Sequence, residues 1–332
     1  MQSIPVAASE AGADGFALEV RYVHGDAAAL LADPHALAVV RFGSGARDAV
    51  AGCVDVPLEP IGAAPCELWR VPGPVRRGCE GGVRFARSGA LQWFVIEAGE
   101  ADGDIRRAAR EAYATARAFL RASAWPHALR VWNTIAAITE GEGDAERYRQ
   151  FCVGRAEGMA GDWGPFPAAT AVGSVLPPGR LQVYVLSASA PGVPVENPRQ
   201  VSAWRYPRQY GPQPPSFARA MLGPSPGLPL LVSGTASVVG HASAHAGSVL
   251  AQLEETCANL ERLLAAAREQ RPALPERFGP GSLLKVYLQQ PEHAEAARAF
   301  LEHRFPGAAP LLLRAHVCRR ELLVEIDGFH GP

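Results

Sequence analysis

The spacing of hydrophobic positions along the chain predicts an alternation of strands and helices. Residues 104–124 place Ile105, Ala109, Ala112 and Ala116 on one stripe at helical spacing, and Asp104 stands where an N-cap is expected. A second helix is expected at 144–160. Apolar runs bounded by Gly, Pro and Asp predict strands, which in this half fall at 16–22, 36–42, 91–98, 129–132 and 181–187.

The second half of the chain repeats this order. A long helix is expected at 248–268, where Leu253, Leu260 and Leu264 share a face, and a shorter one at 291–304. Each half therefore runs strand, long helix, strand, short helix, strand, which predicts a duplicated α+β unit. The strands of the second half are expected at 229–239, 283–288, 311–317 and 321–327.

A segment rich in Pro, Arg and aromatic residues, 191–228, separates two predicted domains, 1–190 and 229–332. It is too long for an ordinary connection and too aromatic for a disordered linker. Its run from 196 to 210 holds three arginines and three aromatic rings. Such residues bind carboxylates and line small-molecule pockets, but they equally pin a loop to the protein body. The composition alone does not favour either interpretation.

Composition and charge exclude several classes of protein. Of the 332 residues 48% are hydrophobic, and 32 basic residues face 33 acidic ones, so neither disorder nor a nucleic-acid or membrane surface is indicated. Six cysteines are scattered without metal-ligand spacing. No phosphate-binding or hydrolase motif occurs. No run is long enough to span a membrane, and residues 1–16 do not read as a leader, so a cytoplasmic protein is expected.

Glu325 is the first candidate for chemistry. It stands in the last predicted strand, 321–327, with apolar residues on both sides. A carboxyl held in such surroundings has a raised pKa, which suits a general acid near neutral pH. The alternative is a glutamate on the solvated face of an edge strand. Cys318, in the preceding predicted strand, is by pattern alone a small core residue.

Two further pairs stand at helical spacing. Tyr148 and Arg155 lie seven residues apart, so they share a helix face beside Phe151 and either line a cleft or cover the core. His241 and His245 lie four residues apart, but no Cys or carboxylate joins them at ligand spacing. An ordinary polar loop is the expected interpretation of the histidines.

Four pieces of the C-terminal half resemble the RidA/YjgF family: VSGTAS at 232–237, QLEETCANL at 252–260, KVYL at 285–288 and LVEID at 323–327. This resemblance implies two RidA/YjgF-like, chorismate mutase-like α/β domains, the first of them degenerate. Each is expected to have a mixed sheet with helices packed on one face. Such domains form trimers or pseudo-trimers, and small acids bind in the clefts between units.

The segment PVENPRQVSAWRYPRQYG at 194–211 resembles the signature loop of the chorismatases, which are two-domain relatives of RidA. VWNTI at 131–135 and YRQFCVGR at 148–155 are also similar to that family, and together the matches extend over most of 83–328. The resemblance implies an enzyme that removes pyruvate from chorismate without a metal or organic cofactor. It implies a small-molecule substrate, no nucleic-acid or membrane partner, and a monomer or homotrimer.

The resemblance also implies roles for individual residues. Glu325 matches the acid of the family, which protonates the enolpyruvyl methylene carbon. Arg155 and a loop arginine, Arg205 or Arg208, are expected to hold the two carboxylates of chorismate. The rest of the expected substrate site is Tyr148, Tyr206, Tyr210, Gly234 and Ala236.

The expected product follows from Cys318, which resembles the branch that makes 3-hydroxybenzoate; some members also release 4-hydroxybenzoate. The hydrolytic branch, which makes a dihydroxycyclohexadiene carboxylate, usually has Ala there, and Gly234 or Ala236 is expected at a second discriminating position. A RidA-like small-acid-binding protein or imine deaminase is an alternative, although Lys285 stands where a deaminase needs Arg. A chorismate lyase shares the substrate but should lack the duplicated pattern.

Overall fold

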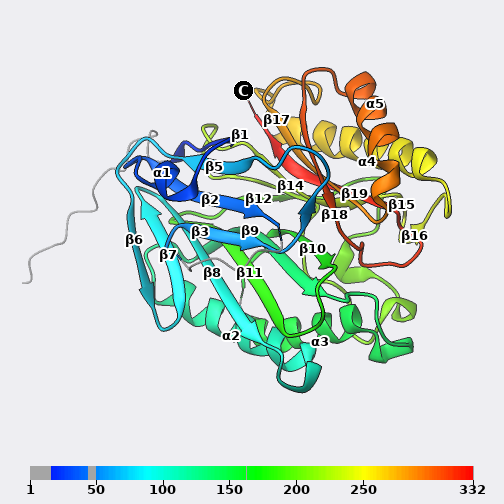
Figure 1. Cartoon of the computed structure of the whole chain (residues 1–332), viewed down its shortest axis with the longest axis horizontal. Helices are drawn as coiled ribbons and strands as arrows, with labels where there is room; N and C mark the ends of the chain where they lie inside the picture. The colour runs from blue at the N-terminus through cyan, green and yellow to red at the C-terminus, as the bar shows by residue number, and fades with distance from the viewer. Residues whose placement is uncertain (1–15, 44–49, 162, 332) are drawn as a thin grey trace, which may run out of the picture.

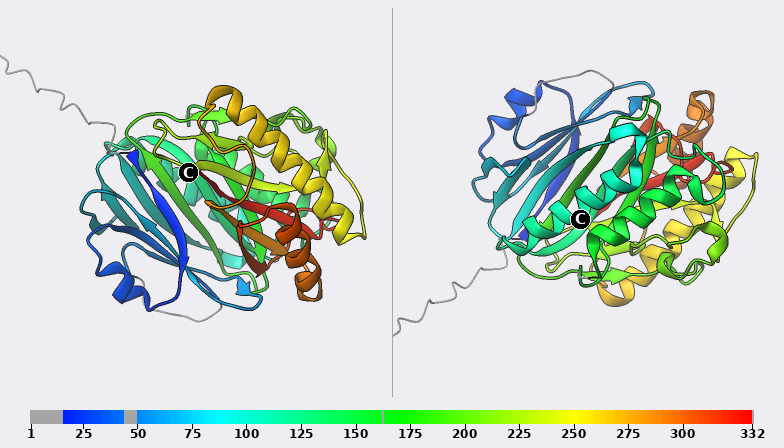
Figure 2. Two further views of the ribbon diagram at one scale, coloured as in Figure 1. Left: turned by 90° about the horizontal axis from the view of Figure 1, so that it is seen from above. Right: turned by 90° about the horizontal axis from the view of Figure 1, so that it is seen from below.

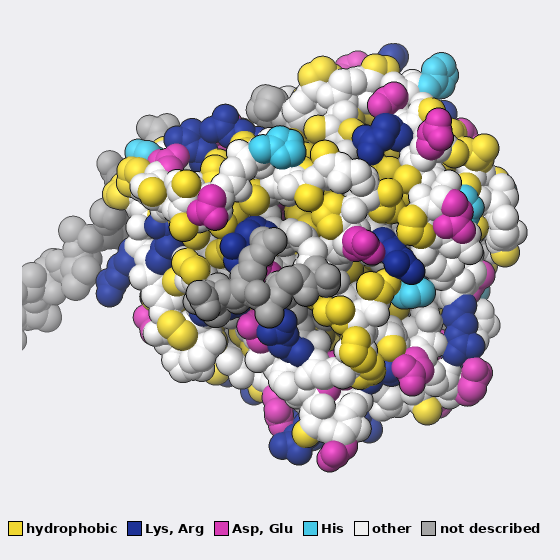
Figure 3. All heavy atoms as spheres, viewed as in Figure 1, with side chains coloured by type: hydrophobic (Ala, Val, Ile, Leu, Met, Phe, Trp, Pro, Cys, Tyr) yellow, Lys and Arg dark blue, Asp and Glu magenta, His cyan; other side chains and the backbone are white. Residues whose placement is uncertain are grey.

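The computed structural model describes residues 16–43, 50–161 and 163–331. Within these residues the strands form three larger sheets and one small hairpin (Figure 1). The N-terminal stretch 1–15, most of the segment in which no leader was expected, lies outside the described residues. On the face shown in Figure 3, basic and acidic side chains are interspersed, as expected from the balanced composition.

The first sheet is built from residues 19–70. It has the strand order β1-β5-β2-β3, and one short helix, α1 (Ala27–Leu31), follows β1. Asp26 caps this helix by accepting hydrogen bonds from the backbone nitrogens of Ala28 and Ala29. The strands are β1 (Glu19–Val23), β2 (Ala36–Phe42), β3 (Cys53–Val56) and β5 (Cys66–Arg70).

The second sheet has the order β10-β9-β11-β8-β7-β6 and carries helices α2 (Ile105–Arg121) and α3 (Arg147–Met159). The Asp104 carboxylate accepts a hydrogen bond from the backbone nitrogen of Arg107, which confirms the predicted N-cap of α2. The strands are β6 (Arg76–Glu80), β7 (Val83–Ser88), β8 (Leu91–Gly99), β9 (His127–Ala136), β10 (Ala168–Ser174) and β11 (Arg180–Ala188).

The third sheet has the order β12-β13-β14-β19-β17-β18-β4 and carries helices α4 (Val249–Gln270) and α5 (Ala294–Arg304). Its last strand, β4 (Glu59–Pro60), comes from the first unit of the chain. The other strands are β12 (Val193–Val195), β13 (Ala220–Leu222), β14 (Leu230–Ala236), β17 (Ser282–Leu288), β18 (Ala309–Arg314) and β19 (Val324–His330); β15 (Val238–Val239) and β16 (Ala242–Ser243) form the hairpin.

The same four-strand pattern occurs in all three sheets. In the second sheet, β8-β11-β9-β10 pair antiparallel, antiparallel and parallel, and β14-β19-β17-β18 pair in the same sequence in the third. The first sheet repeats it as β1-β5-β2-β3. The expected duplication of an α+β unit with mixed sheets is therefore confirmed, and residues 19–70 add a third, smaller copy of the pattern.

The three sheets turn their helix-free faces toward one interior. Side chains from all three meet there in one large hydrophobic cluster, for example Trp69, Trp132 and Phe329. Helices α2 and α3 cover the outer face of the second sheet, and α4 and α5 cover that of the third (Figure 2). Because both faces of these sheets are buried, their strands read as continuous apolar runs.

Several element boundaries differ from the predictions. Helix α3 begins at Arg147 instead of 144, because a 3-10 turn at Gly143–Ala145 precedes it. Strand β18 ends at Arg314, so Cys318 lies in the turn before β19 and not in a strand. Strand β19 begins at Val324 instead of 321, and β10 had no counterpart among the predicted strands.

The Pro-rich segment 191–228 is ordered, as its aromatic content indicated. Its two ends pair with each other as β12 and β13, which extend the third sheet. Between them lie two 3-10 turns, Ala203–Arg205 and Arg208–Tyr210. The structure thus places this segment against the third sheet, and the proposed domain limits at 190 and 229 stay a prediction.

Candidate active site

A cavity of about 450 Å³ lies between the second and third sheets. Strand β10 lies at the edge of the second sheet, and near both of its ends it is hydrogen-bonded to the C-terminal part of the chain, which builds the third sheet. Ala218 N donates to Pro167 O at 3.0 Å, and Gly173 N donates to His316 O at 2.7 Å. Ala169 N also donates to Ser233 Oγ between these two bridges, and Ala169, Thr170 and Ala171 line the cavity. The cavity therefore occupies a seam between two repeated units.

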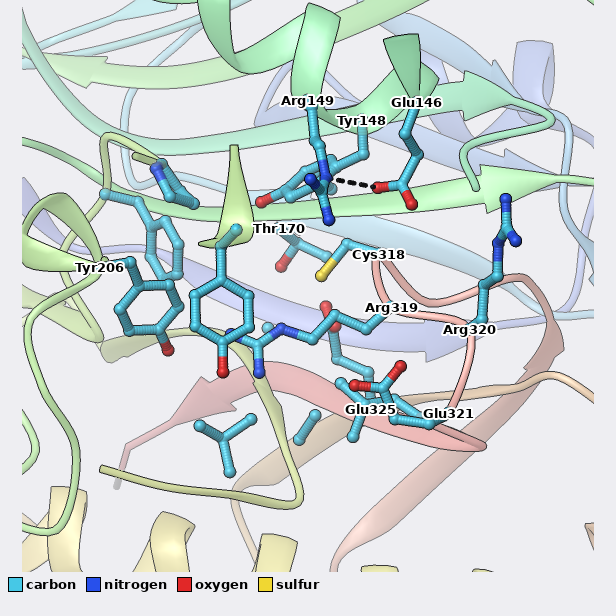
Figure 4. A pocket seen from close by; sticks show the side chains of 18 of the residues that line it. Glu146, Tyr148, Arg149, Thr170, Tyr206, Cys318, Arg319, Arg320, Glu321 and Glu325 are labelled. Atoms are coloured by element: carbon cyan, nitrogen blue, oxygen red, sulfur yellow. Dashed lines mark ion pairs between the residues drawn. The ribbon is translucent and has the colours of Figure 1, made fainter. Parts of the chain in front are cut away.

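Glu325 projects into this cavity from β19 (Figure 4). Its exposed fraction is 5%, and burial raises its pKa from 4.5 to about 8. The charge of Asp327 raises the pKa further, whereas Arg130 and Arg219 lower it. The carboxyl predicted from sequence to have a raised pKa is thus protonated in most molecules at neutral pH.

Gly234 on β14 makes room for the Glu325 carboxyl. A Cβ atom at position 234 would lie 2.0 Å from Glu325 Oε1 and 3.4 Å from the Thr170 methyl carbon. Any side chain at this position would displace the carboxyl. Gly234 and Ala236, both expected at the site, line the cavity.

Cys318 reaches the cavity from the turn that follows β18. Burial, together with the nearby Glu325, raises the pKa of its thiol to about 12, and Arg319 opposes this only in part. The thiol is therefore neutral at physiological pH, which makes it a weak nucleophile on its own.

Arg155 lies on the cavity wall formed by α3 and is 3% exposed. Its guanidinium carbon lies 5.0 Å from the centre of the Tyr113 ring, but Nε and Nη2 have no hydrogen-bond partner among the described residues. A buried cation without partners is costly unless an anion joins it. The arrangement is suited to a carboxylate ligand.

Tyr148 shares this wall with Arg155, as their seven-residue spacing predicted. Its ring stacks on Phe151 with centroids 6.2 Å apart, and burial raises the pKa of its hydroxyl well above 10. The hydroxyl is therefore a neutral hydrogen-bonding group in this cavity.

The loop supplies Tyr206 and Tyr210 to the cavity, but not the expected arginines. Arg205 is exposed, and Arg208 forms an ion pair with Asp144 at the surface. Neither lines the cavity, so the structure corrects the prediction that one of them faces the substrate. A loop has no regular periodicity, so its sequence does not predict which side chains point into the cavity.

Two arginines that were not expected at the site take that place, Arg219 and Arg319. Arg219 donates to the Tyr206 hydroxyl at 2.7 Å, and its Nε has no partner among the described residues. The Arg319 guanidinium lies 4.0 Å from the centre of the Tyr210 ring. Arg319 directly follows Cys318 in the sequence. The proximity of Cys318 to the predicted site was therefore the signal that could have identified Arg319.

No metal site is found in the described part of the chain, where no group of three or more His, Cys, Asp and Glu is arranged to hold an ion. His241 and His245, which the sequence left as polar loop residues, have separate partners: Tyr210 at 3.2 Å and Glu255 at 3.4 Å. Among the described helices none is long and apolar enough to cross a membrane.

Comparison with known proteins identifies relatives of this chain. Residues 67–187 match the family model for the N-terminal part of FkbO/Hyg5-like chorismatases. A 3-hydroxybenzoate synthase of Streptomyces hygroscopicus is 35% identical over 79% of this chain and 80% of its own length. A chorismatase of the same organism is 34% identical over 79% of this chain and 78% of its own.

A solved structure shows the same fold. The crystal structure of a chorismatase at 1.08 Å resolution superposes with a TM-score of 0.85 and 31% identity, covering 95% of this chain and 98% of the other. The similarity thus includes both repeated units and the seam between them. The chain belongs to the chorismatase family.

Proposed function

We propose that this protein converts chorismate to 3-hydroxybenzoate and pyruvate, with 4-hydroxybenzoate as a second product. The observation that carries the proposal is the pairing of a protonated Glu325 with a buried, unpartnered Arg155 across one cavity. An acid and a carboxylate anchor are what a substrate with an acid-labile enol ether and two carboxylates requires.

Two groups of cations are proposed to hold the two carboxylates. Arg155 offers Nε and Nη2, two donors in the fork geometry that a carboxylate accepts. Arg219 and Arg319, which contact Tyr206 and Tyr210, form the second group. This assignment replaces Arg205 and Arg208 with two arginines that line the cavity.

Glu325 is proposed to act as the general acid. Its proton passes to the methylene carbon of the enolpyruvyl group, which leaves a positive centre at the ether carbon. The ether bond then breaks on the pyruvyl side. Atom balance requires the carbonyl oxygen of pyruvate to come from water or from the 4-hydroxyl, whose loss makes the ring aromatic. A ring proton released in that step restores Glu325, so no co-substrate is consumed.

Cys318 supports the 3-hydroxybenzoate branch in this proposal. Because its thiol is neutral beside Glu325, it can share a hydrogen bond with the ring oxygens without adding negative charge. The hydrolytic branch would instead consume one water and release a non-aromatic diol. Membership of the chorismatase family favours both branches over a small-acid-binding protein. Lys285, which stands where an imine deaminase needs Arg, is fully buried and does not line the cavity.

The test is an incubation with chorismate in the absence of metal and nucleotide, with pyruvate and ring products separated by chromatography. We expect pyruvate in an amount equal to the sum of 3-hydroxybenzoate and 4-hydroxybenzoate. The Glu325→Gln variant should bind chorismate but release pyruvate about 10²–10⁴-fold more slowly, the usual contribution of a general acid. Turnover at the wild-type rate would remove Glu325 from this role, and a diol product would move the protein to the hydrolytic branch.

A cytoplasmic location and a monomeric or homotrimeric state complete the proposal. The six cysteines are scattered, and a chain of 332 residues does not need disulfides to fold, which suits a reducing compartment. Cell fractionation and the molar mass measured by light scattering would test the two points separately.

A further inference from the structure

Asp327 lies directly behind the proposed acid. It stands two residues after Glu325 on β19, so both side chains leave the same face of the strand. Glu325 reaches the cavity, whereas Asp327 is fully enclosed. One of its oxygens, Oδ2, accepts four hydrogen bonds, from Thr170 Oγ1 at 2.7 Å, Tyr287 OH at 2.9 Å, Arg130 Nη2 at 3.0 Å and Trp132 Nε1 at 3.1 Å.

These donors hold Asp327 as a carboxylate. Lys285 Nζ lies 3.7 Å from the second oxygen, Oδ1, and pairs with Glu67 of the first sheet at 3.1 Å. Two carboxylates and two cations therefore form a buried cluster, to which all three units contribute. The cluster is balanced without Glu325, so an ionised Glu325 would add an excess negative charge beside Asp327.

Thr170 connects the cluster to the cavity. Its hydroxyl accepts a hydrogen bond from Arg130 at 2.5 Å and donates one to Asp327. Its methyl group and the Glu325 carboxyl both lie next to the position that a Cβ atom of residue 234 would occupy. Arg130 Nη2 also donates to Val232 O at 3.0 Å. These bonds fix Arg130 on Asp327 and its neighbours, and no hydrogen bond joins it to Glu325 among the described residues.

The other groups around Glu325 do not replace the effect of Asp327. The charged groups that act on it are Asp327 on β19, Arg130 on β9 and Arg219 before β13. The nearby Cys318 and Tyr148 have raised pKa values and are neutral near pH 7. Glu146 and Glu321 also line the cavity, but Asp327 is the acidic group with the largest effect on Glu325.

We propose that Asp327 is a positioning residue for Glu325: its negative charge adds to the effect of burial and favours the proton-carrying form of the neighbouring carboxyl between turnovers. This inference rests on the proposed role of Glu325 as the acid. An ordinary glutamate at pH 7 carries a proton in only about one molecule in several hundred. With a pKa near 8, about nine Glu325 side chains in ten carry it.

The experiment is the pH dependence of kcat/KM in the Asp327→Asn variant. Activity requires the protonated acid, so it falls as pH rises through the pKa of Glu325. In the variant this descending limb should move down by about one to two pH units, the range over which a neighbouring charge shifts a carboxyl. The rate should drop about 5- to 50-fold at pH 8 and recover toward pH 5. A limb that stays in place, together with an unchanged pKa of the Glu325 carboxyl and activity lowered equally at every pH, would leave Asp327 a purely structural residue and overturn the proposal.

A matched control separates charge from packing. The double variant Lys285→Met/Glu67→Gln disturbs the same buried cluster by removing one balanced pair, but it keeps Asp327 and its four donors. The descending limb of its kcat/KM profile should lie at the same pH as in the wild type, even if the variant is less stable. Should Asp327→Asn fail to fold, Asp327→Asn/Lys285→Met removes a charge pair together and should show the same downward shift.

Infrared titration of the Glu325 carboxyl, taken as the difference between each protein and its Glu325→Gln counterpart, gives a readout independent of turnover. A lowered carboxyl pKa in Asp327→Asn with an unmoved activity limb would support the positioning role and reject Glu325 as the acid. An unmoved carboxyl pKa, with Glu325→Gln inactive, would reject the positioning role and retain the acid.

Discussion

Strands β11 and β19 occupy the same place in the second and third sheets, but their interior faces differ in chemistry. On β11 this face carries Gln182 and Tyr184, and the Tyr184 ring stacks on Trp132 with centroids 4.8 Å apart. On β19 it carries Glu325 and Asp327. Both faces lie within the same closed interior, so burial alone does not explain the difference.

The comparison teaches where a buried charge can be tolerated. The donors to Asp327 come from β9, β10 and β17, and the partner of Lys285 comes from β5. No single sheet supplies the whole set. A repeated fold with three sheets around one interior can therefore stabilise acidic groups on one strand with donors from the other units, while the equivalent strand stays neutral.

The largest expected effect in this comparison is a pH-dependent loss of stability that the interior face of β19 causes and that of β11 does not. The pKa of Glu325 is raised in the folded state, so the unfolded chain ionises first as pH increases. Stability should be unaffected below about pH 4.5 and should fall until about pH 8. The Glu325→Gln variant lacks this loss and should gain up to about 5 kcal/mol relative to wild type across that window.

Urea unfolding at several pH values, performed on both proteins, measures this difference. Gln182→Met on β11 is the matched control, because it removes a buried polar side chain that does not ionise. Its unfolding free energy should differ from wild type by the same amount at every pH. A constant difference for Glu325→Gln as well would mean that Glu325 is ionised in the folded state.

A second prediction concerns the cation that faces β19 from the second unit. Arg155→Met should lower kcat/KM by about 10²-fold, because a hydrogen-bonded ion pair with a substrate carboxylate contributes roughly 1.5–3 kcal/mol. The same change should raise the urea midpoint, since it removes an unpartnered buried charge. Arg208→Met, at the surface, should alter kcat/KM less than twofold. An unchanged KM and kcat in Arg155→Met would exclude it from the substrate site.

The smallest effect is expected from a single methyl group. Gly234→Ala on β14 places a Cβ against Glu325 Oε1 and should lower kcat about 10-fold and alter the ratio of 3- to 4-hydroxybenzoate. Gly99→Ala at the end of β8, the corresponding strand of the second sheet, meets no atom within 4 Å and should leave both unchanged. Product analysis of the two variants would contradict the proposal if they behaved alike.

The sequence predicted the elements whose signals are local. Helix α2 has its cap at Asp104 and its stripe of alanines, and Tyr148 and Arg155 share a face because helical spacing requires it. Glu325 was recognisable as a carboxyl between apolar neighbours. These inferences need only the neighbours of each residue along the chain.

The missed residues depend on contacts between distant parts of the chain. Which of Arg205, Arg208 and Arg219 faces the cavity is decided by the conformation of the loop between β12 and β13. Arg130 and Asp327 are 197 positions apart and meet only because two sheets face each other. Strand β10 is short and rich in small residues, and its assignment depends on its pairing with β9 and on its bridges to the third unit.

One pairing has a consequence for synthesis of the chain. Strand β4 is only two residues long, and its partners, Leu313 and Arg314, lie more than 250 positions later in the chain. The adjacent Ile61 nitrogen likewise donates to Leu312 O. The N-terminal segment that contains β4 is synthesised first, and it can complete these hydrogen bonds only after β18, near the C-terminal end, has been synthesised. Until then the unpaired strand edge at β4 is open to contact with other chains.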